Sequence, residues 1–126
     1  MAQISGVNGV WDSPSDRRLK ENIRPLTSAL DKVNEIGIYN YAFKHDQDKT
    51  KHIGVLAQQL KDIYPELVHE AEGQYGVAYA QLAVVAIQAI KEQQSRIDEL
   101  RSRVETLKAM SRDSSAQKVQ TSPKTK

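Results

Sequence analysis

The hydrophobic positions follow two different periods in the first half of the chain. In "TSALDKVNEIG" they recur every third residue, at Leu30, Val33 and Ile36. This spacing predicts a helix that Thr27 or Ser28 caps and Gly37 ends. From residue 38 the period becomes two, and one side of the predicted strand carries three aromatic residues: Tyr39, Tyr41 and Phe43.

Short apolar runs and turn residues predict the elements that follow. "HIGVLA" at 52–57 is typical of a second strand, so we expect residues 38–57 to form a hairpin around the polar turn 45–51. "AQQLKDIYPEL" predicts a helix that ends before Pro65, because the residue before a proline disfavours helical backbone. A second small hairpin is expected in "LVHEAEGQYGVAY", turning at residues 72–74.

The pattern changes at Tyr79, where a long helix is predicted. Residues 79–110 contain neither glycine nor proline, and at about 1.5 Å per residue they would span roughly 48 Å. The first part, Ala80 to Ile90, is apolar nearly all round, so we expect it to be buried. In the second part Glu92 and Arg96 have the spacing of a favourable ion pair within one helix.

The second part of this helix also carries a heptad pattern. Its seam positions alternate three and four residues apart: Ile90, Gln93, Ile97, Leu100, Val104 and Leu107. Isoleucine at the first seam position, with Gln93 inside the seam, favours a trimer at least as much as a dimer. We therefore predict an α+β fold in which a helix and hairpin module precedes a long C-terminal helix that forms a trimeric coiled coil.

The two ends of the chain lack such patterns. Residues 1–14 are rich in small polar residues and are interpreted as an extended segment that ends a preceding stalk or linker. Residues 111–126 are polar and without period, so a disordered tail is expected. The domain itself is then predicted at 15–110, with its long helix at 79–110.

The stretch "SPSDRRLKENI" (13–23) allows two interpretations. In the first it starts a helix, with Ser13 as the cap, Pro14 in the first turn, and an end near Asn22. In the second it carries a nucleophile, Ser15, and a base, Lys20. Five residues of regular helix would leave these two side chains about 140° apart. If they act together, Ser15 must lie outside the helix with the chain folded back, and geometry alone favours the cap.

Composition narrows the function classes. The net charge of +2 is too small to indicate nucleic acid or an anionic membrane, and there is no cysteine for disulfides or thiolate metal sites. No apolar run is long enough to span a membrane. Three histidines lie singly, so no metal and no cofactor is predicted: His45, His52 and His69.

Three segments together resemble a known family. "SDRRLKENI", "HIGVLAQQLKDIYPELV" and "YAQLAVVAIQAIKEQQSRIDEL" are similar to the C-terminal intramolecular chaperone domains of phage tail fibres and endosialidase-type tailspikes, which are classed as self-cleaving Ser-Lys peptidases. The resemblance covers about residues 13–107. It implies a domain that trimerises, helps the stalk before it to fold in register, and then cuts itself off.

The resemblance also implies roles for individual residues. Ser15 matches the nucleophile and Lys20 the base, and the bond that is cut would be Pro14–Ser15. Asp16 and Asn22 occupy motif positions from which they would orient the loop. The expected partners are two further copies of the chain and the fibre stalk of the same polypeptide. The expected location is the bacterial cytoplasm during phage assembly and then the virion tail, from which this domain would be released.

Two other functions stay open from the sequence. The first is a trimerisation module without proteolysis, in which 13–16 only starts a helix. The second is a nucleic-acid-binding coiled coil that uses basic residues of the long helix: Arg96, Arg101, Arg103 and Lys108. We also hypothesise that assembly regulates cleavage, with the trimer packing Ser15 against Lys20.

Overall fold

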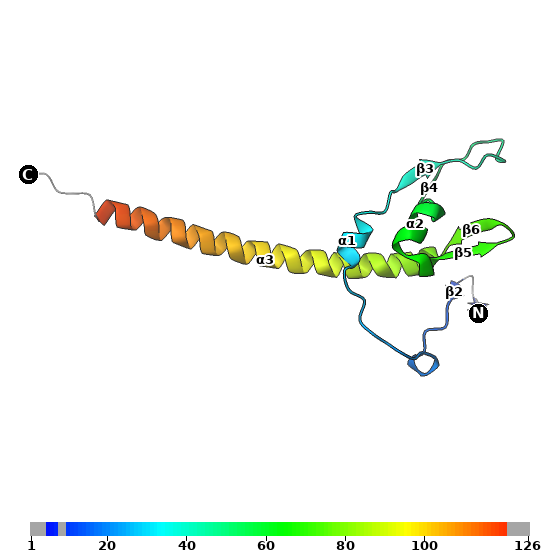
Figure 1. Cartoon of the computed structure of the whole chain (residues 1–126), viewed down its shortest axis with the longest axis horizontal. Helices are drawn as coiled ribbons and strands as arrows, with labels where there is room; N and C mark the ends of the chain where they lie inside the picture. The colour runs from blue at the N-terminus through cyan, green and yellow to red at the C-terminus, as the bar shows by residue number, and fades with distance from the viewer. Residues whose placement is uncertain (1–4, 8–9, 121–126) are drawn as a thin grey trace, which may run out of the picture.

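A long helix dominates the computed structural model, which describes residues 5–7 and 10–120 (Figure 1). This helix, α3, runs from Tyr79 to Gln120 and at about 1.5 Å per residue is about 63 Å long. The small elements gather at its N-terminal end, and its C-terminal half projects away from them (Figure 1). The predicted α+β fold with a long C-terminal helix is confirmed.

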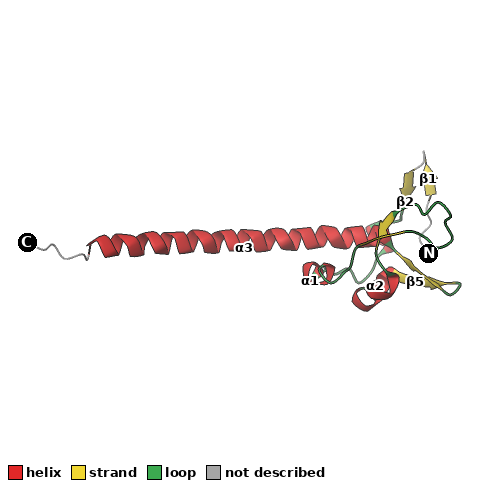
Figure 2. Cartoon of the chain, turned by 90° about the horizontal axis from the view of Figure 1, so that it is seen from above, coloured by secondary structure: helices red, strands yellow, loops and turns green. Residues whose placement is uncertain are grey.

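The core lies where two short helices meet one face of α3. The helices α1 (Ala29–Val33) and α2 (Ala57–Ile63) lie on the same side of α3 (Figure 2). The single-turn 3-10 helix η2 (Pro65–Leu67) directly follows α2. Six residues from these four elements and from the junction between α2 and η2 are buried: Ala29, Leu60, Tyr64, Leu67, Val85 and Ala89. A core of six residues is too small to stabilise the full length of α3, so most of this helix depends on contacts outside the core.

The start of α3 is buried on one face only. Val85 and Ala89 contact the core, whereas Val84 and Ile87 are 62% and 59% exposed. The expectation that the segment from Ala80 to Ile90 is buried nearly all round is therefore wrong for a single chain. The physical reason is that α1 and α2 cover one side of the helix and the described part of the chain supplies no second layer.

A carboxylate from α3 caps α1. Glu92 accepts hydrogen bonds from the backbone N–H groups of Ala29 (3.0 Å) and Leu30 (3.2 Å). Burial raises the pKa of Glu92, but these bonds and one from Gln88 outweigh it, so that pKa lies below its usual range. Ser28, one of the two predicted caps, has a left-handed backbone and makes no side-chain cap bond.

The same contact changes the predicted ion pairing of α3. Arg96 pairs with Asp31 of α1 at 2.9 Å rather than with Glu92. The prediction of a Glu92–Arg96 pair is wrong because both side chains turn toward α1, where backbone N–H groups and a carboxylate compete for them. These contacts fasten α1 against α3.

Both predicted hairpins are confirmed. Strands β3 (Tyr39–Tyr41) and β4 (His52–Gly54) are antiparallel, with Tyr39 opposite Gly54. Strands β5 (Val68–Ala71) and β6 (Gln74–Val77) pair around Glu72-Gly73, both of which have positive φ. Gly54 is buried where a Cβ atom would lie 2.5 Å from the Tyr79 hydroxyl, so only glycine fits there without a shift.

The N-terminal segment is more structured than predicted. Strands β1 (Ser5–Val7) and β2 (Val10–Asp12) form an antiparallel pair in what we expected to be an extended lead-in. The dipeptide Asn8-Gly9 is a strong hairpin signal in the sequence and predicts this pairing. Residues 1–4 and 8–9 lie outside the described residues.

The long helix also continues farther than predicted. The expected disordered tail from residue 111 is wrong as far as Gln120, because α3 includes these residues. No proline occurs between Tyr79 and Pro123, and a helix already formed adds residues at little cost. The rest of the expected tail, 121–126, lies outside the described residues. Among the described helices, none is long and apolar enough to cross a membrane.

Candidate functional site

The segment between β2 and α1 forms an exposed loop around a single 3-10 turn. The turn, η1, covers Arg17–Leu19, so the predicted helix from Ser13 to Asn22 is reduced to three residues. Asp16 caps it, because its carboxylate accepts the Arg18 backbone N–H at 2.9 Å. The cap interpretation of Ser13 is therefore wrong, since an ionised carboxylate already satisfies the turn.

Asp16 also binds the side chain of the residue it caps. The Arg18 guanidinium donates to both carboxylate oxygens, the shortest bond being 2.7 Å. The hydrogen bonds from the Arg18 side chain and backbone hold the pKa of Asp16 below its usual range, and Asp16 raises the pKa of Arg18. One residue thus fixes the turn at its start.

This turn brings Ser15 and Lys20 together. The Lys20 ammonium Nζ donates a hydrogen bond to Ser15 Oγ over 2.7 Å. Ser15 lies just before the turn, and Lys20 follows it with extended backbone (φ −113°, ψ 146°). A regular helix would have separated the two side chains, whereas one 3-10 turn folds the chain back, as the dyad interpretation requires.

The hydrogen bond between Lys20 Nζ and Ser15 Oγ forms within a single chain. Our hypothesis that trimer packing brings Ser15 to Lys20 is not needed to explain their contact. Asn22, the other predicted orienting residue, has left-handed backbone with φ 55°. Asparagine tolerates this conformation better than most residues, so Asn22 redirects the chain after the turn.

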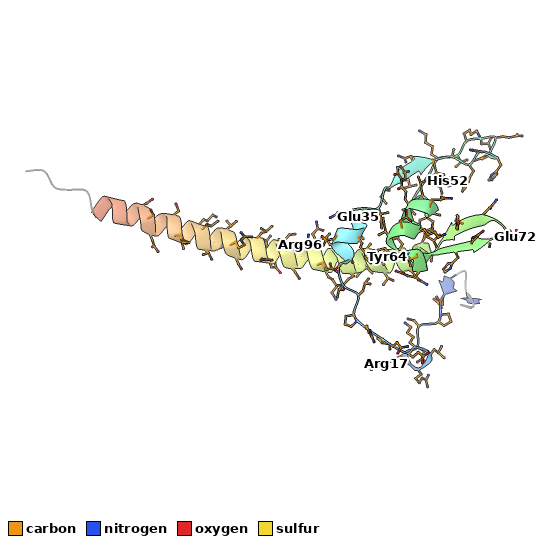
Figure 3. The ribbon with its side chains drawn as sticks, viewed as in Figure 1. Arg17, Glu35, His52, Tyr64, Glu72 and Arg96 are labelled. Atoms are coloured by element: carbon orange, nitrogen blue, oxygen red, sulfur yellow. The ribbon has the colours of Figure 1, made fainter. Side chains whose placement is uncertain are left out.

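A cavity of about 670 Å³ lies beside the pair. Ser13, Pro14, Ser15 and Lys20 line it from the loop. The opposite wall comes from η2, its neighbours and α3, with three polar side chains: Tyr64, Glu66 and Gln81. Figure 3 shows the loop that carries Arg17 projecting from the body and Tyr64 lying against α3. Both residues of the Pro14–Ser15 bond therefore line one cavity that is open to solvent.

Tyr64 is the most unusual residue of this wall. It is 2% exposed, and its hydroxyl has no hydrogen-bond partner among the described residues. Burial, followed by the charges of Glu66 and Glu92, raises its pKa. The Lys32 ammonium lies 4.8 Å from the centre of its ring.

Sequence reasoning missed the residues of this opposite wall. The stretch "DIYPEL" predicts only that a helix ends before Pro65. No periodicity in it marks Tyr64 or Glu66 as part of a site. Their contribution depends on how η2 and α3 pack against the loop, which is a tertiary arrangement. Position in the sequence alone gives no signal for it.

The predicted seam residues lie on the projecting part of α3 and are exposed. Ile90 and Leu107 are 63% exposed, and Ile97 is 38% exposed. Leu100, Val104 and the polar Gln93 are exposed as well. Within a single chain this apolar row has no covering element in the described part of the structure.

Two comparisons relate this chain to known proteins. Residues 15–69 match the model of a peptidase family described as the chaperone of endosialidase. The matched part of the chain begins at Ser15, includes Lys20 and η2, and ends at the second residue of β5.

The relatives are tail fibre proteins. The Long tail fiber protein Gp37 of Enterobacteria phage K3 is 34% identical over 105 residues, which cover 71% of this chain. The protein of the same name from Enterobacteria phage T2 is also 34% identical over 105 residues. The aligned stretch spans only 8% and 7% of the length of these two relatives. The resemblance to tail fibre chaperone domains is thus confirmed.

The histidines and carboxylates outside the Ser15–Lys20 site were the candidates for a metal site. No group of three or more histidine, aspartate or glutamate residues that could hold a metal ion is found in the described residues. His45 and His52 both lie against Phe43 on the β3–β4 hairpin, at ring distances of 5.3 and 5.1 Å. These two histidines are therefore packing partners of an aromatic cluster.

Proposed function

We propose that this chain is an intramolecular chaperone domain that trimerises a phage tail fibre or tailspike and then releases itself by cutting its Pro14–Ser15 bond. The observation that carries the proposal is the 2.7 Å hydrogen bond between Lys20 Nζ and Ser15 Oγ. The family match and the tail fibre relatives support the chaperone role. The parent protein would belong to the virion, with assembly in the host cytoplasm.

The cut follows from ordinary acyl-transfer chemistry. Lys20, after losing its ammonium proton, accepts the proton of Ser15 Oγ, and the oxygen attacks the carbonyl carbon of Pro14. The tetrahedral intermediate collapses with cleavage of the Pro14–Ser15 C–N bond, and the Ser15 nitrogen takes a proton. The resulting ester between the Pro14 acyl group and Ser15 Oγ is hydrolysed by water. The products are a Pro14 carboxylate and a chain that begins at Ser15.

Trimerisation accounts for the exposed seam of α3. Ile97, Leu100 and Val104 would be buried between three parallel helices, where each apolar side chain gains the free energy of leaving water. A helical trimer forms from local contacts and hence quickly, whereas a stalk of intertwined strands folds slowly and is prone to wrong register. The trimer would hold three stalk ends together while they find their register.

Release after folding gives the domain a second effect. Once the trimer is removed, a stalk that unfolds has lost the element that aligned its chains. Its durability then depends on the unfolding rate rather than on an equilibrium. Self-cleavage by a single-turnover serine peptidase site is therefore consistent with a chaperone that acts once.

Substitutions at the two serines beside Pro14 test the proposal. We expect the refolded chain to be cut completely, Ser15→Ala to stay intact, and Ser13→Ala to be cut, since both serines line the cavity but only Ser15 contacts Lys20. Lys20→Arg keeps the charge but cannot serve as a base, and it should also stay intact. The measurement is intact mass after refolding.

Uncut chains in all four proteins, each of them trimeric, would contradict self-cleavage. The non-proteolytic trimerisation module would then be the better description. Cutting of Ser15→Ala at the wild-type rate would likewise contradict the role of Ser15.

A further inference from the structure

The positions that flank the seam of α3 carry basic residues. Arg96 and Arg101 lie directly beside seam positions, and one heptad later Arg103 and Lys108 do the same. None of the flanking positions from 94 to 108 is acidic. In a parallel coiled coil, the residue before the first seam position lies beside the residue five positions farther along the next chain. Three parallel copies would therefore place Arg96 of one chain beside Arg101 of the next, where the two like charges repel.

The helix α1 packs on the side of the seam that carries Arg96. The residues of α3 that contact α1 or the core follow one another at spacings of four, three and four: Val85, Ala89, Glu92 and Arg96. The seam lies on the neighbouring face and stays uncovered, with Ile90 63% exposed. One α3 helix can therefore hold α1 and a second copy of α3 side by side, and α1 would lie next to the flank of that copy.

Asp31 of α1 is the carboxylate at this junction. Its Oδ1 accepts a hydrogen bond from Arg96 Nη2 at 2.9 Å, and the Asp31 side chain remains 65% exposed. The other charged side chains of the junction are occupied. Glu92 accepts the backbone N–H groups at the start of α1, and the Lys32 ammonium lies over the Tyr64 ring. An ionised carboxylate accepts several hydrogen bonds, so Asp31 has the capacity for a second cation.

We propose that Asp31 joins neighbouring chains: its carboxylate binds Arg96 of its own chain and Arg101 of the next copy. This inference rests on the proposed trimer. A repelling pair of arginines would become an arginine–carboxylate–arginine bridge, and each chain would complete the site of its neighbour. The flanking pair Arg103 and Lys108 lies farther along α3, beyond α1, where Lys108 has only Glu105 of its own helix at 4.0 Å.

Removal of the Asp31 charge tests the bridge. Asp31→Asn keeps the size of the side chain but leaves Arg96 and the next Arg101 unneutralised. At about 20 mM salt we expect the association constant of the trimer to fall about tenfold to hundredfold, because three exposed ion pairs are lost. At about 500 mM salt the difference should nearly vanish, because salt screens exposed charges. Asp62→Asn, which removes the same charge from an exposed position of α2, should match the parent chain at both salt concentrations.

A second substitution distinguishes a bridge between chains from a role of Asp31 within α1. Arg101→Glu introduces a carboxylate that attracts Arg96 of the neighbouring chain and repels Asp31. In that background Asp31→Asn should strengthen the trimer, whereas in the parent chain it weakens it. A purely structural role of Asp31 in α1 would give the same sign in both backgrounds. The measurement is sedimentation equilibrium of the full chain, with Ser15→Ala present throughout so that each sample contains one uncut species.

The outcomes separate this inference from the proposed function. A parent trimer that Asp31→Asn leaves unchanged at low salt overturns the bridge and leaves the trimer intact. A parent chain that is monomeric at every salt concentration overturns both. If Asp31→Asn does not fold, crosslinking decides, since the chain has no cysteine of its own. A short bismaleimide should join Asp31→Cys to Arg101→Cys into a covalent trimer, and a trimer that gives no such product overturns the bridge.

Discussion

At the scale of single residues, the site depends on one turn of chain. Asp16 caps the 3-10 turn and binds Arg18, and this turn places Ser15 Oγ 2.7 Å from Lys20 Nζ. A regular helix would have kept these atoms apart. The spacing of five residues is unfavourable for a dyad in a regular helix. A 3-10 turn of three residues between Ser15 and Lys20 brings the same two residues into contact.

Variants of Asp16 test the contribution of this turn. Asp16→Asn keeps an oxygen that can cap Arg18 but loses the charge, so we expect cleavage to slow about twofold to threefold. Asp16→Ala loses both and should slow it about tenfold. The measurement is the rate of cutting by intact mass at neutral pH. Equal rates in all three chains would show that the turn forms without Asp16.

At the scale of the elements, the sequence predicts most of the fold. Periodicity and proline position give α2, both hairpins and the start of α3, because each depends on local pattern. The cap of α1 could not be predicted, because the residues that make it are more than 60 positions apart in the sequence. The cavity wall that carries Glu66 could not be predicted either, because the packing of η2 on α3 creates it. The β1–β2 pair was predictable from Asn8-Gly9 and was missed.

The Glu92 cap gives a prediction on stability and pH. Glu92→Gln removes the carboxylate that receives the N–H groups of Ala29 and Leu30, and we expect the melting temperature to fall by about 4–8 °C. Because the pKa of Glu92 is lowered in the folded chain, its contribution is present above the ordinary glutamate range and is lost as the pH falls through the folded value.

Thermal unfolding at neutral and acid pH measures both effects. Glu99→Gln, an exposed position on the same helix, is the matched control and should melt like the wild type. A gap between Glu92→Gln and the wild type that stays constant from neutral pH to about pH 3 would contradict the ionised cap.

At the scale of the whole molecule, a small core carries a helix far longer than it needs. Six buried residues hold α1, α2 and η2 against the first turns of α3, and the apolar seam beyond them is exposed. A partner is the simplest reason for such a row of side chains. In the proposed trimer, this helix would connect the folding of one chain to the assembly of three.

Substitution of the seam tests the trimer. Ile97→Asp together with Leu100→Asp places charges between the helices, and we expect a monomer by analytical ultracentrifugation. Ser102→Asp lies on the opposite face of the heptad and should stay trimeric. A trimer that survives the double substitution would place the contact elsewhere on the molecule.

Mixed trimers test whether each chain cuts itself. The Ser15–Lys20 bond joins side chains of one chain, so a trimer that contains Ser15→Ala and Lys20→Ala chains should produce no cut. The two chains are refolded together, one of them isotopically labelled, and analysed by mass. A 15–126 fragment from the Lys20→Ala chain would show that a lysine acts across chains.

The mass of the refolded wild-type chain tests the central claim most directly. The account predicts two products, whose masses correspond to residues 1–14 and 15–126, so that the larger one begins with the free amino group of Ser15. A single species with the mass of all 126 residues, in a chain shown to be folded and trimeric, would contradict it, as would a cut at any other bond.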